Sequence, residues 1–206
     1  MKKGARRKSE LLHIAYTRFL ENGYEQTSVD EIINEAQIAK GTFYHYFQSK
    51  EQILEQVVEM VMQKGLERAD NMLGSALSVP EKIIGVILAF RPMEAELVIQ
   101  NTLNQPENVL LHDRVNKKLI RDVVPLLAEI VREGIRQGLF DCEQIEERVK
   151  LILIMSSRLF DDGVFSENET IAFIDMVEKT IGAKTGTMEF IKKLISGGQI
   201  DEDNKG

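Results

Sequence analysis

Residues 27–47 read TSVDEIINEAQIAKGTFYHYF, and this stretch decides the fold. An apolar stripe at helical spacing follows Ser28, whose hydroxyl can cap a helix together with the glutamate three residues later. The helical pattern restarts at Lys40, and Phe43 and Phe47, four residues apart, share one face of the second helix. Two short helices joined by about four residues form a helix-turn-helix pattern, whose second helix would enter a major groove of DNA.

Helical spacing continues on both sides of this stretch. The preceding segment repeats apolar residues on one face and ends at Gly23, where we expect a left-handed helix cap. After the stretch, Ser49 is expected to cap a much longer helix that continues towards Asn71. Because strand alternation is almost absent, the sequence predicts an all-α protein. It would consist of a three-helix helix-turn-helix domain, 1–49, and a helical bundle, 50–196.

The four prolines predict where helices of the C-terminal part begin or break. Pro80 falls in the first turn of a helix, and Pro92 interrupts the helical pattern that follows, so we expect a kink or break there. Pro106 and Pro125 are expected near the starts of two further helices, the second of which ends at the GLF stretch, 138–140.

Two more helices are predicted towards the C-terminus. The first, within 143–165, becomes apolar on every side from Leu151 to Met155, so it must be covered all round. The second, within 169–183, repeats isoleucine and valine on one face. The last residues, 197–206, are acidic overall and are predicted to form a disordered tail.

Composition narrows the functional class. The 206-residue chain has no run of about 18 apolar residues, so no membrane span is expected. No apolar segment typical of a secretory signal follows the charged N-terminus, and we expect a cytoplasmic protein. Cys142 is the only cysteine, which rules out an internal disulfide and a cysteine-built metal site. The three histidines form no metal-binding pair and no catalytic motif is complete, so the sequence predicts no enzyme, metal or cofactor.

The net charge of −7 is distributed unevenly along the chain. Residues 1–50 hold eight Lys or Arg and six Asp or Glu, whereas residues 51–206 hold 18 and 27. Five of the positive charges fall within the first eight residues, at Lys2, Lys3, Arg6, Arg7 and Lys8. Such a cluster is either a solvated polar tail or an arm that seeks phosphate groups.

If the two phenylalanine rings face the core, the polar residues of the second helix lie on its other sides. These residues are Lys40, Thr42, Tyr44, His45 and Tyr46. Thr42 could approach base edges, while tyrosine hydroxyls, lysine ammonium groups and the amides at the helix start could donate to phosphate oxygens. Gly41 weakens the helix by up to about 1 kcal/mol relative to alanine, and we interpret it as allowing the backbone to approach DNA closely. Tyr46 could instead flank the core of the small domain.

Residues 15–54 read AYTRFLENGYEQTSVDEIINEAQIAKGTFYHYFQSKEQIL, and this segment resembles the TetR family of bacterial transcriptional regulators. The resemblance implies a DNA-binding regulator, most often a ligand-responsive repressor, which binds a palindromic operator on double-stranded DNA as a homodimer. It implies phosphate contacts at Ser28, Tyr44 and Lys50, and groove contacts at Lys40, Thr42 and His45.

Two residues of the second helix depart from the family pattern. Ala39 precedes the helix where the family often has a serine, so a side-chain cap worth about 1 kcal/mol is absent and we expect a looser helix in the protein without DNA. His45 and Tyr46 stand in the reverse of the usual order. Which of these two side chains faces bases and which faces phosphates is left open by the sequence.

The resemblance also implies how the C-terminal bundle works. Its last two helices would pair with those of a second subunit in a four-helix interface, although they could be core helices of a monomer. A pocket in the bundle would bind a small-molecule effector. The pocket candidates are Met62, Phe90, Met93, Arg114, Met155 and Arg158. Methionines at helical spacing can also be plain core, and arginines can extend to the surface.

A second hypothesis is a helical small-molecule or protein-binding module whose N-terminal unit has lost DNA binding. The acidic bundle is compatible with it. The salt dependence of duplex binding separates the two hypotheses, because log K falls linearly with log salt by about 0.9 for each phosphate contact.

Overall fold

The computed structural model describes residues 3–90, 93–159 and 166–195. Within these ranges the chain forms helices joined by turns and loops, and no strand occurs. The all-α class predicted from the sequence is therefore confirmed. The proposed tail at 197–206 lies outside the described residues, and so does Pro92.

The N-terminal helices follow one another in the order that the sequence predicts. They are α1 (Lys3–Asn22), α2 (Val29–Glu35), α3 (Lys40–Tyr46) and α4 (Lys50–Leu73). Gly23 follows α1 with a φ of 80°, and its N–H donates to the Phe19 carbonyl at 3.1 Å, as expected for a left-handed cap. At the start of α4, the Gln52 N–H donates to the Ser49 hydroxyl at 3.2 Å, which confirms the predicted cap.

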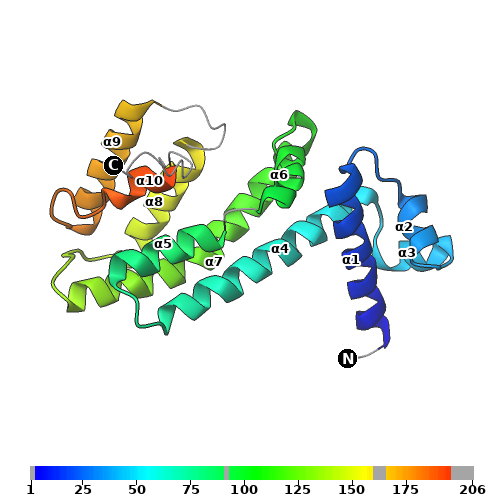
Figure 1. The fold of residues 1–206 in the computed structure, drawn as a ribbon, viewed down its shortest axis with the longest axis horizontal. Coiled ribbons are helices and arrows are strands. Elements are labelled where there is room, and N and C mark those ends of the chain that lie inside the picture. The colour runs from blue at the N-terminus through cyan, green and yellow to red at the C-terminus, as the bar shows by residue number, and fades with distance from the viewer. Residues whose placement is uncertain (1–2, 91–92, 160–165, 196–206) are drawn as a thin grey trace, which may run out of the picture. The chain divides into compact units, whose positions relative to one another are not determined.

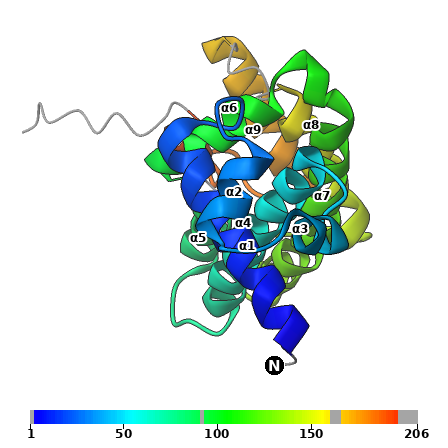
Figure 2. The same cartoon turned by 90° about the vertical axis from the view of Figure 1, so that its right-hand side faces the viewer.

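The core of the N-terminal helices is built from residues that are almost fully shielded from solvent. They include Leu11, Ala15 and Phe19 from α1, Ile32 from α2, Phe43 from α3, Phe47 just after it, and Ile53 and Leu54 from α4. Both rings of the deciding stretch are thus in the core. Figures 1 and 2 show α2 and α3 beside α1.

The remaining elements form the C-terminal part of the chain. They are α5 (Val79–Ala89), η1 (Glu94–Glu96), α6 (Leu97–Leu103), η2 (Pro106–Asn108), α7 (Val109–Arg136), α8 (Ile145–Leu159), α9 (Glu167–Ile181) and α10 (Phe190–Ile195). Pro80 lies in the first turn of α5, and the helical pattern that follows is divided between α5 and α6, as predicted.

Pro125 does not start a helix, and this prediction from the sequence is wrong. The residue lies inside α7, which continues for eleven residues beyond it. The buried side chains of Val123, Leu127 and Ile130 form one apolar stripe across the proline, whose own side chain is exposed. Burial of this stripe holds the helix together despite the missing backbone donor, because most helical stability in proteins comes from packing of the apolar face.

The chain divides into two compact units. One contains residues 1–65 and 90–117, and the other contains residues 66–89 and 118–206, so that α4 and α7 each contribute to both. The functional domain limits expected from the sequence, 1–49 and 50–196, stay predictions.

Two charged side chains are buried in the described part of the second unit. Lys82 of α5 donates to the Glu133 carboxylate of α7 at 2.7 Å, and its side chain is only 6% exposed. Glu178 of α9 accepts hydrogen bonds from the backbone N–H groups of Gly186 and Met188 at 3.0 and 2.8 Å. Each charge therefore has partners, as buried charges require.

No helix in the described part of the chain has the length and apolar character needed to span a membrane.

Candidate nucleic-acid interface

The turn between α2 and α3 is short and has a defined backbone conformation. It comprises residues 36–39, within which Gln37 adopts a left-handed φ of 51°. The Ala36 N–H donates to the Ile32 carbonyl at 3.0 Å, and the Ile38 N–H donates to the Ile33 carbonyl at 3.2 Å. These bonds close the end of α2 and direct the chain into α3, which gives the predicted helix-turn-helix.

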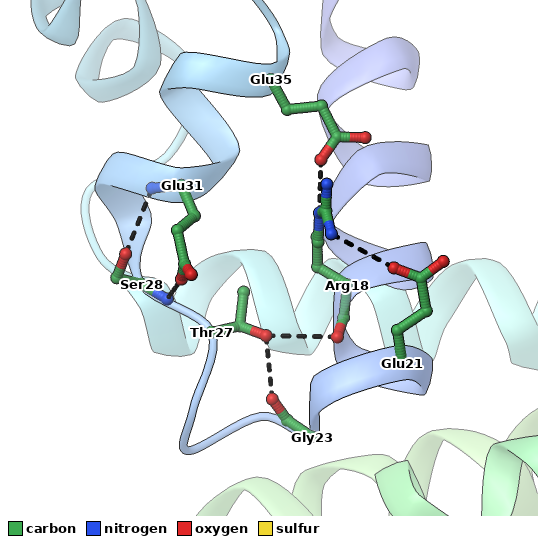
Figure 3. A network of polar contacts seen from close by, with 7 residues as sticks. All are labelled: Arg18, Glu21, Gly23, Thr27, Ser28, Glu31 and Glu35. Atoms are coloured by element: carbon green, nitrogen blue, oxygen red, sulfur yellow. Dashed lines mark hydrogen bonds and ion pairs between the residues drawn. The ribbon is translucent and has the colours of Figure 1, made fainter.

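Ser28 and Glu31 form the predicted capping box at the start of α2 (Figure 3). The Glu31 N–H donates to the Ser28 hydroxyl at 3.1 Å, and the Ser28 N–H donates to the Glu31 carboxylate. The pKa of Glu31 is lowered by hydrogen bonding of its carboxylate to the Ser28 backbone amide, which has the larger effect, and to the Ser28 hydroxyl. Because α2 is only seven residues long, this cap fixes the helix start where propensity alone would not.

A polar network fixes α2 against α1 (Figure 3). Arg18 of α1 donates to Glu35 at the end of α2 at 2.5 Å and to Glu21 at 3.3 Å. The buried Thr27 hydroxyl lies within hydrogen-bond distance of the Arg18 and Gly23 carbonyls, at 3.2 and 2.9 Å. Sequence reasoning missed this network, because the Arg18–Glu35 and Thr27–Arg18 contacts join residues that are 17 and nine positions apart and form no local motif.

Two sides of α3 have opposite roles. Phe43 is buried, and its ring centroid lies 5.7 Å from that of Phe47. Tyr44, the next residue, is 46% exposed and touches the Phe43 ring edge-on at a centroid distance of 5.4 Å. Lys40 and His45 are also exposed. The rings therefore fix α3 in the core while polar side chains face outward, as the sequence predicts.

Lys40 is paired within the protein. Its ammonium group lies 3.1 Å from a carboxylate oxygen of Asp30, and both side chains are well exposed. The hydrogen bond to Asp30, followed by the charge of Asp30, raises the pKa of Lys40. Because an exposed ion pair contributes little to stability, a phosphate or a base edge can replace Asp30 as the partner of Lys40.

We expect Asp30→Asn to strengthen duplex binding by about two- to fivefold, because it removes a competing anion beside Lys40 and reduces repulsion of phosphates. Fluorescence anisotropy on a random-sequence duplex measures the change. The matched control is Asp175→Asn, which breaks the Lys179–Asp175 pair in the second unit. Equal gains from both variants would show that only net charge is responsible.

The remaining candidates of α3 differ in burial. Tyr46 is half-buried, and a Cβ built on Gly4 of α1 would lie 3.6 Å from its hydroxyl oxygen. The exposed His45 ring contacts the Tyr46 ring edge-on, at a centroid distance of 5.1 Å. Thr42 is half-buried, whereas a Cβ on the exposed Gly41 would meet no atom within 4 Å. Packing within the protein therefore does not require a glycine at position 41.

Lys50 makes contacts that the sequence did not predict. Its ammonium group donates to the Glu25 carbonyl at 3.3 Å and lies 4.0 Å from the centre of the Tyr24 ring. Tyr24 is buried, and this burial, with the nearby Glu51, raises the pKa of its hydroxyl. Lys50 thus ties the loop after α1 to the start of α4. Its phosphate contact stays a prediction.

The six pocket candidates differ in their surroundings. In the first unit, Met62 is buried, Phe90 is half-buried and Met93 is exposed, while Arg114 pairs with Glu55 at 3.1 Å. In the second unit, Met155 and Arg158 are exposed on α8. The candidates are thus divided between the two compact units, and the pocket assignment stays a prediction.

A metal-binding cluster of three His, Cys, Asp or Glu residues does not occur among the described residues. Cys142 is half-buried, and burial raises the pKa of its thiol, so the thiolate that metal binding needs is disfavoured.

Two family models match the chain. The model for bacterial regulatory proteins of the tetR family matches residues 11–57, which include α2 and α3. The model for the tetracyclin repressor-like C-terminal domain matches residues 94–178.

Two curated relatives are similar over about two thirds of their length. The transcriptional repressor KstR2 of Mycolicibacterium smegmatis is 32% identical over 141 residues, which are 66% of this chain and 68% of that protein. The fatty acid metabolism regulator protein of Bacillus subtilis is 30% identical over 134 residues, which are 63% of this chain and 68% of that protein.

Solved structures share the fold. RolR in complex with resorcinol has a TM-score of 0.62 and 18% identity, over 95% of this chain and 96% of its own. A transcriptional regulator from Cytophaga hutchinsonii has a TM-score of 0.57 and 19% identity, over 84% of this chain and 93% of its own.

Proposed function

This chain belongs to the tetR family of bacterial regulatory proteins and is a DNA-binding transcriptional regulator, and from this premise we propose that it is a dimeric, ligand-responsive repressor of the cytoplasm. Each subunit inserts α3 into the major groove of one half of a palindromic operator. The supporting observation is the arrangement of side chains around α3. Phe43 and Phe47 are buried in the core and hold the helix in place, whereas Lys40, Tyr44 and His45 are exposed to solvent. The half-sites would be spaced by one helical turn or a multiple of it.

The proposed contacts divide into two kinds. The first kind binds phosphates and comes from Ser28, Tyr44 and Lys50. These contacts position the protein on the duplex but do not distinguish one base sequence from another. Lys40, Thr42 and His45 reach base edges, with Gly41 allowing close approach of the backbone. Tyr46 supports this surface from its half-buried position between α3 and α1.

We expect Tyr44→Phe to weaken binding to every duplex sequence by about three- to tenfold, because it removes one phosphate hydrogen bond per subunit. Anisotropy titrations on an operator and on a scrambled duplex measure both affinities. The matched variant is Thr42→Ala, which should change base preference instead. A loss confined to one base position with Tyr44→Phe would contradict the assigned role of the tyrosine.

Homodimerisation is supported by apolar side chains that lie exposed on α8 and α9. They are Leu151, at 59% exposure, with Ile154, Met155 and Ile171. The sequence indicates that the helix around Leu151 must be covered on every side, and a second subunit supplies that cover. We propose that α8 and α9 of two subunits form a four-helix interface.

We expect Leu151→Lys to raise the dimer dissociation constant at least about tenfold, which corresponds to about 1.4 kcal/mol, because it places a charge in the interface. Sedimentation velocity across a concentration series measures the oligomeric state. Lys150→Gln, a change at the neighbouring exposed position, is the control. A variant that remains as dimeric as the unaltered protein would exclude α8 from the interface.

The proposed effector binds in the C-terminal part and acts by shifting populations. It weakens operator binding only by its differential affinity for the two conformations of the dimer. In the first unit, Arg114 offers a cation for an anionic group, and Met62, Phe90 and Met93 offer adaptable apolar surface. In the second unit, Arg158 and Met155 offer the same two kinds of contact. Small molecules that bind the protein but never change its operator affinity would argue against this regulation.

The alternative of a binding module without DNA affinity is not favoured, because the relatives are transcriptional regulators. We propose no enzymatic role for the same reason.

A further inference from the structure

The start of α1 carries positive side chains that helix stability does not explain. Arg6, Arg7 and Lys8 follow two lysines of the first three residues, and the first turn contains no acidic residue. Positive charge at a helix N-terminus is unfavourable, because the helix dipole already places partial positive charge there. Stabilisation of α1 therefore does not account for these charges.

The first two turns of α1 lie beside the end of α3. A Cβ built on Gly4 would lie 3.6 Å from the Tyr46 hydroxyl oxygen, and the Lys8 ammonium group lies 5.7 Å from the centre of the Phe47 ring. Both contacts lie within the first compact unit. The positive charges are consequently adjacent to the helix that enters the groove.

Helical spacing separates the three described cations into two groups. One side of α1 faces the core and carries Gly4, Lys8 and Leu11, which are spaced four and three residues apart. Arg7 lies next to this side. Arg6 points to the opposite side of the helix and is exposed, whereas Arg7 and Lys8 are partly covered. Arg7 and Lys8 are therefore the cations on the side of α3.

The present partners of these two cations can be exchanged for phosphate. Arg7 pairs with Glu10 at 2.9 Å, and both side chains are more than a third exposed, so the pair is screened by water. Lys8 contacts the face of a ring, which leaves its ammonium hydrogens able to donate to an anion. Duplex DNA offers a row of phosphates that continues past the groove occupied by α3.

We propose that Arg7 and Lys8 bind backbone phosphates of the DNA strand that flanks the groove entered by α3, and so extend the interface onto α1. This inference rests on the proposed function. The contacts add affinity and salt dependence without adding base preference, because phosphates carry no sequence.

The test is a salt series of anisotropy titrations with the full chain on an operator and on a scrambled duplex. For Arg7→Gln/Lys8→Gln, the slope of log K against log salt should become shallower by about 0.9 for each phosphate that the variant no longer binds, equally on both duplexes. The matched control is Arg6→Gln, on the opposite side of α1, which should leave the slope nearly unchanged. An unchanged slope for the double variant, or an equal change per charge for Arg6→Gln, would overturn the proposal.

A charge-preserving variant excludes loss of folding as the cause. Arg7→Lys/Lys8→Arg should retain the original slope, and thermal unfolding should show that the glutamine variants stay folded at the assay temperature. If the charge-preserving variant loses the slope as fully as the glutamine variant does, the proposal is wrong. Failure of the proposed function looks different, because the unaltered protein would then show no salt-dependent binding and Tyr44→Phe would have no effect.

Discussion

Phe43→Ala is expected to abolish operator binding and to destabilise the N-terminal helices by about 3–5 kcal/mol, the usual cost of deleting a buried aromatic ring. Phe43 is fully buried and lies against the rings of Phe47 and Tyr44. Because α3 has seven residues and no side-chain cap at Ala39, its position depends on this packing and not on intrinsic helix stability.

Urea unfolding followed by circular dichroism measures the loss of stability, and anisotropy measures the loss of binding. Tyr44→Ala is the matched control, since it deletes the adjacent ring on the exposed side. We expect this control to lose DNA affinity with a far smaller change in unfolding free energy. If Phe43→Ala keeps both its stability and its operator affinity, the ring is not what fixes the recognition helix.

Lys82→Met is expected to destabilise the second unit by about 3 kcal/mol. The Lys82 side chain is 6% exposed and that of its partner Glu133 is 25% exposed, so the substitution leaves a largely buried carboxylate without its cation. Among the contacts of the described residues, Glu133 keeps the hydrogen bond from the neutral Gln137 amide, at 3.1 Å. A neutral donor does not compensate for the lost charge.

The double variant Lys82→Met/Glu133→Leu should recover most of this stability, because it removes both charges together. Chemical denaturation of the two single variants and the double variant gives the coupling energy. Lys179→Met, which breaks an exposed pair with Asp175, is the control and should cost less than about 0.5 kcal/mol. A similar cost for both single lysine substitutions would mean that Lys82 is not effectively buried.

Local signals explain why the N-terminal elements could be predicted from the sequence. The Ser28 capping box, the left-handed Gly23 and the Phe43–Phe47 spacing each involve residues within a few positions of one another. Their physical rules hold without knowledge of the rest of the chain. All three features are present in the structure.

The parts that were missed depend on residues distant in sequence. Lys50 was predicted to contact phosphate, and nothing local indicates that it also binds the Glu25 carbonyl and the Tyr24 ring. Pro125 satisfied a local rule for helix starts, but the packing of α7 on both sides of the proline overrides that rule.

One missed feature did have a sequence signal. Lys82 stands on the apolar stripe of α5, between Val79 and Ile83, and Glu178 stands likewise beside Val177 and Ile181 on α9. A charge at a stripe position predicts a buried charge with a dedicated partner. The identity of the partner, however, comes only from the tertiary structure.

One side of α3 is buried in the core and the other is exposed to solvent. Because of this division, the DNA sequence that the protein prefers can change without a change in its folding. The buried Phe43 sets where the helix sits, whereas Lys40 and His45 make few contacts with the core. Substitutions at these exposed positions can therefore accumulate during evolution, or be introduced by mutagenesis, while the N-terminal helices stay folded. Duplicated copies of such a gene could in this way diverge to control different promoters.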